Sequence, residues 1–509
     1  MNQAWVFGDT DASLPSELLL QILSYLDAVS LLCAGCVNRR FYHLANDNFI
    51  WIRIFSTAFS PKRSNWKVNS VEKTAMSMKL LSVGDKEAGY WKKEYITKQI
   101  ASVKAALARI LKPLHPYTGL PIKTKEALRM SGLGWVIILK GNSGEEYIME
   151  HVDLSINDSS VTAVWYGRDW PRLATLSTLD LCGVTPVFMD RSKTPTKNGP
   201  RWQSLIARFN LSHLARSPEL GCDGRIRTFC LPPGLVVGLW KMPGLWLTCS
   251  SRRPLEKGSF RPGHLPPRQG RCARGRFLCS PASCCPTCRC VGLETNSSHR
   301  VCQREEELAF VMANLHFHHL VERSTFGSAA VPYELPPHTP VLDDSPERGL
   351  RGYQLHVDMH SGGVFCLCGT FRNLFTSKEY IENEYMKLSV ISFKNNTEHL
   401  PLIGKVGLSW KTNVFDGCIK NCSIMDLTLL EEYGKPFWCF SSPVRMRASP
   451  VPRHGPPFPG ETYRVEHADA EGRVHVQLVR IPHSSEYFIV SLALYLPVAK
   501  VNRWFGTDY

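Results

Sequence analysis

The side chains best suited to chemistry are cysteines and histidines, and several of them gather in two short stretches. The first, Cys284-Cys285-Pro-Thr-Cys288-Arg-Cys290, contains a Cys-x-x-Cys pair, which can place two thiolates on one tetrahedral zinc ion. No second well-spaced Cys-x-x-Cys pair and no matching pair of histidines accompanies it, and only His299 and Cys302 could complete a site by proximity. We therefore favour cysteines that bind no metal, and we expect no cofactor.

The second stretch is Leu315-His-Phe-His-His-Leu320, which holds three histidines. On a β-strand His316 and His318 would share one face, with His319 on the other, and no carboxylate or cysteine stands at ligand spacing. We predict structural or surface histidines there. Cys366 and Cys368 would likewise share one strand face as core thiols.

Motifs for catalysis are missing from the sequence. It contains no Gly-x-Ser-x-Gly elbow, P-loop or His-Glu-x-x-His motif, and no catalytic-cysteine signature whose partners can be placed. We therefore expect a protein without catalytic activity of its own.

The length and composition narrow the class of protein. A chain of 509 residues is long enough for about two to four domains, and 44% hydrophobic residues exclude a wholly disordered chain. No apolar run approaches the roughly 18 residues of a membrane span. The N-terminus lacks the basic and apolar regions of a secretory signal, so we expect a cytoplasmic or nuclear protein whose 18 cysteines are thiols or metal ligands.

Residues 242–303 differ from everything around them. They hold ten Arg or Lys against two acidic residues, which is +8 of the net charge of +15, and eight of the 18 cysteines. Their sequence has the period of neither a strand nor a helix, which predicts a disordered insert rather than a nucleic-acid-binding face. The flanking residues 234–241 and 307–317 are typical of strands, so we predict that the insert interrupts a β-hairpin. An alternative exon or a translated retained intron would account for it.

The elements with the clearest pattern lie in residues 13–59, which predict a compact unit of three or four helices. Asp27 and Asn38 can cap the second and third helices, and Asp47 or Asn48 the fourth. So small a unit cannot hide all of its apolar residues, so part of its stripe should meet a partner. The stripe on the first helix comprises Leu18, Leu19, Ile22, Leu23 and Leu26.

This pattern closely resembles the F-box. The resemblance rests on Leu14-Pro15-x-Glu17-Leu18-Leu19-x-x-Ile22-Leu23-Ser24-Tyr25-Leu26, then on Leu31-Leu32 and Val37-Asn-Arg-Arg-Phe41-Tyr-x-Leu44-Ala, and finally on Asp47 and Trp51. Further stretches, among them Ala88-Gly-Tyr-Trp-Lys-Lys-Glu-Tyr95 and the C-terminal Asn502-Arg-Trp-Phe-Gly-Thr-Asp-Tyr509, are similar to one member of the same family. The resemblance spans most of residues 13–509 but not residues 242–303.

The resemblance implies a partner and a function. An F-box docks on the Skp adaptor, and through it on the cullin and RING subunit of a Skp–cullin–F-box ubiquitin ligase, while the rest of the chain recruits a substrate protein. A scaffold acting outside ubiquitination is the alternative. The residues implied to form or support the adaptor-binding surface are Leu14, Pro15, Leu18, Ile22, Leu26, Leu31, Val37 and Trp51; Val37 and Trp51 could instead only hold the module together.

The remaining chain predicts helices and then strands. Residues 86–112 have helical spacing, with basic residues that favour a solvated face over contact with an acidic surface, and residues 123–131 predict a shorter helix. From residue 133 some dozen short strands with turn signals predict an antiparallel sandwich or barrel. The expected fold class is α+β, with a flexible N-terminus (1–12), F-box (13–59), helical linker (60–132), β-rich region (133–241 and 304–509) and disordered insert (242–303).

Overall fold

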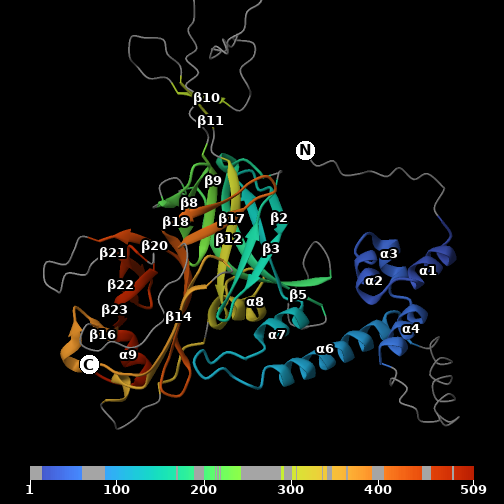
Figure 1. Cartoon of the computed structure of the whole chain (residues 1–509). Coiled ribbons are helices and arrows are strands. Elements are labelled where there is room, and N and C mark those ends of the chain that lie inside the picture. Colours follow the sequence, from blue (N-terminus) through green and yellow to red (C-terminus); the bar gives the residue numbers. More distant parts are fainter. Residues whose placement is uncertain are drawn as a thin grey trace, which may run out of the picture.

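The N-terminal helices stand to one side of a large β-rich body in the computed structural model, and one long helix joins the two (Figure 1). The structure describes residues 14–59, 86–167, 170–187, 200–212, 214, 217, 219–241, 288–291, 301–304, 307–334, 336–340, 347–362, 365–392, 406–449, 460–483 and 486–509. The expected flexible N-terminus and nearly all of the expected insert lie outside these residues.

The N-terminal module has the four helices that the capping residues predicted: α1 (Ser16–Ser24), α2 (Ala28–Ala34), α3 (Arg39–Leu44) and α4 (Asn48–Phe59). The side chain of Asp27 accepts the backbone N–H of Ser30, and that of Asn38 accepts the N–H of Phe41 at 2.8 Å. Each cap satisfies a helix N–H that has no partner inside the helix.

The linker is α6 (Tyr90–Ile110), followed by α7 (Thr124–Ser131). Both helices were predicted from sequence. The 21 residues of α6 correspond to a length of about 32 Å. Its first turns pack against α4, where the Trp51 and Tyr95 rings lie 5.5 Å apart and the Phe55 and Trp91 rings 5.4 Å apart.

Antiparallel strands form most of the remaining described chain, in open sheets rather than a closed barrel. A four-stranded sheet has the order β2-β1-β5-β6, and a six-stranded sheet the order β3-β4-β12-β9-β8-β7. Their bounds are β1 (Gly134–Gly141), β2 (Glu146–Glu150), β3 (Asp153–Ile156), β4 (Ser160–Trp165), β5 (Leu176–Pro186), β6 (Arg201–Asn210), β7 (Glu219–Cys222), β8 (Ile226–Leu231), β9 (Leu235–Trp240) and β12 (Leu308–His316).

The C-terminal strands form a nine-stranded sheet of order β14-β13-β19-β20-β21-β22-β23-β16-β15, and β17 (Gly407–Lys411) pairs with β18 (Asp416–Lys420). The helix α9 (Val498–Phe505) follows the last strand. The bounds of the nine strands are β13 (Tyr353–His360), β14 (Phe365–Leu374), β15 (Ile381–Glu382), β16 (Tyr385–Ile391), β19 (Cys422–Leu430), β20 (Pro436–Ala448), β21 (Glu461–Ala468), β22 (Arg473–Ile481) and β23 (Glu486–Pro497).

The predicted hairpin around the insert is present. β9 pairs with β12 in antiparallel register, from Leu239 opposite Leu308 to Leu235 opposite Ala313, although about 65 residues separate them in sequence. Inside the insert β10 (Cys288–Val291) pairs with β11 (Val301–Arg304), a regular element that its composition did not predict.

The six-stranded sheet lies between the other two large sheets. Alternate residues of β12 belong to two different cores, because successive side chains of a strand point to opposite faces. Val311 and Leu315 join the core shared with Trp135 of the four-stranded sheet, whereas Phe310 joins the core shared with Ile424 of the nine-stranded sheet. The stacking confirms the sandwich form of the prediction.

Candidate functional site

An apolar stripe on the N-terminal module is the first candidate site. Leu14 directly precedes Pro15, the N-cap residue of α1, and Leu18 and Ile22 follow four residues apart on one face of the helix. Leu14, Leu18 and Ile22 are 52%, 47% and 54% exposed, while Leu19 and Leu23 on the other face are buried. A small helical unit that exposes such a row of aliphatic side chains presents a surface for a partner.

The structure separates the eight predicted adaptor-binding residues into two groups. Leu14, Pro15, Leu18, Ile22 and Val37 are exposed, and Leu26 is partly buried. Leu31 and Trp51 are completely buried, so no partner can contact their side chains in this conformation. Sequence reasoning did not single out Tyr25, Val29 and Tyr42 for this surface, although all three are more than half exposed.

Polar contacts hold the module together and attach it to α6. The Arg40 guanidinium donates to the carbonyl of Leu14 at 2.5 Å, which ties α3 to the start of α1. Asn48, itself buried, donates to the carbonyl of Glu87 at 2.9 Å and accepts the backbone N–H of Trp91 at 3.3 Å. The apolar stripe therefore has a fixed orientation relative to the linker helix.

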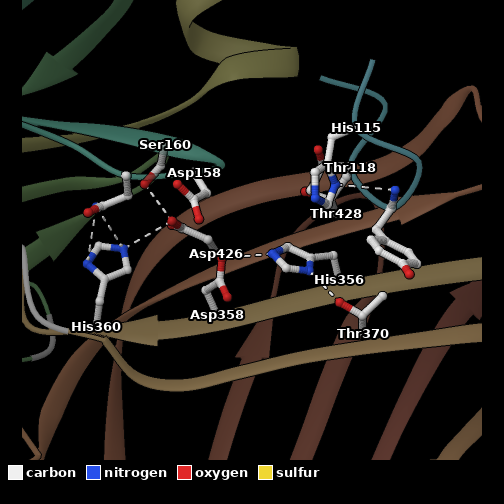
Figure 2. A network of polar contacts seen from close by, with 12 residues as sticks. His115, Thr118, Asp158, Ser160, His356, Asp358, His360, Thr370, Asp426 and Thr428 are labelled. Carbon is white, nitrogen blue, oxygen red and sulfur yellow. Dashed lines mark hydrogen bonds and ion pairs between the residues drawn. The ribbon is translucent and has the colours of Figure 1, made fainter. Parts of the chain in front are cut away.

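A buried polar network between the six- and nine-stranded sheets is the second candidate (Figure 2). Asp426 on β19 accepts the hydroxyl protons of Ser160 on β4 and Ser441 on β20, each at 2.5 Å, and lies 3.0 Å from His360 Nε2 on β13. Burial alone would raise the pKa of Asp426, but hydrogen bonds from His360, Ser160 and Ser441 lower the pKa below its ordinary value.

The network is suited to joining sheets and not to catalysis. The side chains of His360 and Asp426 are 0% exposed, so no substrate can reach them in this conformation. Nearby, the imidazole of His356 lies 3.0 Å from Asp358 and 2.9 Å from the hydroxyl of Thr370 (Figure 2). Figure 2 shows these groups on strands from distant parts of the chain. Their hydrogen bonds hold the two sheets together.

The three neighbouring histidines do not lie together on one strand. His316 is the last residue of β12, but Phe317–Val321 (η4) form a π-helical turn, so His318 and His319 are not on a strand. The shared strand face considered for His316 and His318 is therefore absent from this segment, because pattern alone does not distinguish a strand end from a helical turn. His316 Nε2 lies 2.9 Å from the Thr428 hydroxyl, and His318 Nε2 lies 2.6 Å from the Thr118 carbonyl, so both have structural roles.

The described part of the chain offers no group of three or more His, Cys, Asp or Glu side chains that could hold a metal ion. The side chains of the Cys284–Cys290 stretch, of His299 and Cys302, and of Cys366 and Cys368 lie outside the described residues. The predictions made for these cysteines therefore stay predictions.

A cleft in the β-rich body is the third candidate. Its volume is about 1400 Å³, and it is lined by the turn before β9, by η4 and α8 (Glu322–Phe326), by the first half of β20, by the β21–β22 turn and by α9. Buried aromatic side chains, Phe437 and Trp438, contribute to its floor together with the half-buried Trp504. It joins segments that are far apart in sequence, which is why no sequence motif indicated it.

Comparisons with known proteins agree with the N-terminal assignment. The F-box-like family model matches residues 11–57. Two curated relatives named F-box only protein 15 come from Bos taurus (67% identical, covering 98% of this chain and 93% of the relative) and Macaca fascicularis (66% identical, covering 97% and 100%). A third of that name, from Homo sapiens, is 65% identical over 97% of this chain and 85% of the relative. Among the described helices, none has the length and apolar character needed to cross a membrane.

Proposed function

Because the chain belongs to the F-box only protein 15 family of F-box proteins, we propose that it is the substrate-recognition subunit of a Skp–cullin–F-box ubiquitin ligase. The observation that carries this proposal is the exposed row Leu14, Leu18 and Ile22 on the F-box. In the proposed complex these side chains dock on the Skp adaptor. The adaptor links the chain to a cullin and a RING subunit, inside the cell.

Burial of the row would contribute part of the free energy of docking. Completely burying one leucine or isoleucine side chain stabilises a complex by about 1.5–3 kcal/mol, and these residues are about half exposed before the adaptor arrives. Pro15, Leu26 and Val37 extend the proposed surface. Leu31 and Trp51 support it, because their side chains fill the space beneath.

The proposed division of labour assigns no catalysis to this chain. A conjugating enzyme held at the far end of the cullin would transfer ubiquitin, and the β-rich region would hold the substrate protein within its reach. The contacts of α6 with α4 support this arrangement, because a fixed linker helix sets where the substrate sits. The segments 133–241 and 304–509 would act together in recruitment, since their strands share cores.

Capture of the purified Skp adaptor by the full chain tests the docking surface. Ile22→Asp places a charge at the C-terminal end of the row, on its most exposed side chain, and we expect at least a tenfold loss of captured adaptor. The matched control is Val414→Asp, a charge introduced at an aliphatic side chain that is 64% exposed in the β-rich region. Circular dichroism of both variants separates lost docking from an unfolded F-box. Undiminished capture by a folded Ile22→Asp variant, or by the double variant Leu14→Ala/Pro15→Ala, would contradict the assignment.

A scaffold that binds the adaptor without ubiquitination would pass that capture test. Ubiquitination of proteins labelled by proximity to the chain distinguishes the two functions. If the amounts of proteins near the chain rise when Ile22→Asp replaces the wild type, and also rise on proteasome inhibition, the chain acts as a receptor. Unchanged levels with a fully bound adaptor would instead favour the scaffold.

A further inference from the structure

The cleft in the β-rich body has charged groups on both sides. The acidic groups come from the β21–β22 segment and the basic groups from α8 and α9. These groups are Glu466, Asp469, Glu471, Arg323, Lys500 and Arg503. Their pairing inside the protein decides which sign of charge is left for a ligand.

The acidic groups are already paired. Glu471 lies 2.7 Å from the ammonium of Lys500, and Glu466 lies 3.7 Å from the guanidinium of Arg464. Asp469 accepts the backbone N–H of Glu471 at 2.8 Å and the indole N–H of Trp438 at 3.1 Å. The carboxylates of the cleft therefore need no ligand to balance them.

Arg323 and Arg503 differ from Lys500, which pairs with Glu471. Within the described chain neither Arg323 nor Arg503 makes an ion pair, and the Nε of Arg323 is buried without a hydrogen-bond partner. Burial lowers the pKa of Arg323, and the nearby Glu334 offsets only part of that effect. A guanidinium in this position is stabilised by an anion that enters the cleft, and its planar donors match a carboxylate.

Aromatic side chains line the same cleft. The rings of Phe437 and Trp504 are 5.2 Å apart at 77°, and the imidazole of His338 stacks on Trp504 at 4.0 Å. Pro232 and Pro233 line the same cleft. Such surfaces bind apolar and aromatic side chains, because stacking adds to the gain from burial.

We propose that the cleft binds an extended polypeptide segment of the recruited substrate, one that carries a carboxylate side chain next to an apolar or aromatic side chain. The carboxylate pairs with Arg323 and Arg503, and its neighbour packs against the half-buried Trp504 and the exposed Pro232 and Pro233. A volume of about 1400 Å³ exceeds the roughly 300–1,000 Å³ of small-molecule pockets, which favours a peptide. This inference rests on the proposed function, since it names the substrate class for the β-rich region.

Selection from a phage-displayed library of random 12-residue peptides on the full chain tests this proposal. The most enriched peptide is then synthesised with a fluorescent label, together with a version in which Gln replaces each Glu and Asn each Asp. Anisotropy gives the affinity of both for the wild type, Arg323→Gln, Arg503→Glu and a control, Arg447→Glu, on an exposed part of β20 outside the cleft. Arg503 is exposed, so its substitution is the safer one for folding.

The expected result is enrichment of Asp and Glu beside apolar residues. Binding should weaken about tenfold in each cleft variant and for the amide peptide, and it should not change in Arg447→Glu. The proposal would be overturned if no peptide is recovered or if the recovered peptides lack acidic residues. It would also be overturned if a peptide binds the wild type and both cleft variants with the same affinity. Adaptor capture is measured on the same variants, so a failure of F-box docking is detected separately from a failure of the cleft.

Discussion

Acidification should destabilise the β-rich region, because His316 is buried as the neutral imidazole at the contact between two sheets. Burial, with a smaller effect of the neighbouring His318, lowers the pKa of His316 to about 3, and the nearby Asp426 opposes the shift. The unfolded chain would bind a proton at a pKa near 6.5. Between these values the unfolded state holds the proton and the folded state does not, so stability falls as the pH falls.

The size of the effect follows from the two pKa values. His316 contributes its full stability above pH of about 6.5 and loses about 1.4 kcal/mol for each pH unit below it, down to the folded pKa. Between pH 7 and pH 5 this amounts to about 2 kcal/mol. Burial also lowers the pKa of His319 to about 4, and it lowers the pKa of His318. The wild type should therefore lose more free energy of unfolding between pH 7 and pH 5 than His316 alone accounts for.

Urea unfolding of the full chain at pH 7 and pH 5, followed by tryptophan fluorescence, measures this dependence. The variant His316→Gln keeps a hydrogen-bonding group near Thr428 but cannot titrate, so its loss of stability between the two pH values should be smaller by about 2 kcal/mol. Comparing each protein with itself cancels the cost of the substitution. Thr428→Val is the control, because it removes the hydroxyl beside His316 and should lower stability equally at both pH values.

An identical pH dependence in the wild type and His316→Gln would refute the reasoning. It would mean that His316 is not held neutral, or that the contact between the sheets opens before global unfolding. A smaller pH dependence in Thr428→Val than in the wild type would show that the hydroxyl, and not burial, lowers the pKa of His316.

Three further changes have defined outcomes. Trp51→Ala removes a completely buried indole and should lower the stability of the F-box by about 3–5 kcal/mol, so that helix content in circular dichroism and adaptor capture fall together. Gly234→Ala should lower the melting temperature by several degrees, because its φ of +67° is strained for alanine and the new Cβ would meet the carbonyl oxygen of Asn314 at 2.5 Å. Asp426→Ala removes the acceptor that three buried groups share and should cost about 3–5 kcal/mol in urea unfolding.

Local features of this fold were predictable from the sequence. Asp27 and Asn38 predict the starts of their helices, because a short polar side chain can accept a hydrogen bond from the backbone N–H three residues later. The structure contains both hydrogen bonds. The strands on either side of the insert were predicted for the same kind of reason, since apolar residues and turn signals lie within a few positions of one another. The exposed row on α1 is visible as a four-residue spacing.

Features made from distant segments were not predictable. Asp426 appears in the sequence as one polar residue in an apolar strand, and its partner Ser160 lies 266 positions away. The cleft is similar, because Arg323 and Trp504 come together only after the sheets have stacked. The turn at His318 and His319 escaped prediction because pattern alone does not distinguish the end of a strand from a short helical turn.

The length of the helix α6 also sets the rotation of the F-box, about the helix axis, relative to the β-rich region. Each helical residue turns the chain by about 100° and advances it by about 1.5 Å, so one residue inserted after Lys104 would rotate the F-box about the helix axis without appreciably changing its distance. The proposed substrate cleft would then face a different direction from the adaptor. Seven inserted residues would nearly restore the phase while adding about 10 Å. In the proposed ligase, the lysine that receives ubiquitin is thus selected by the helical phase of a segment that touches neither the adaptor nor the substrate.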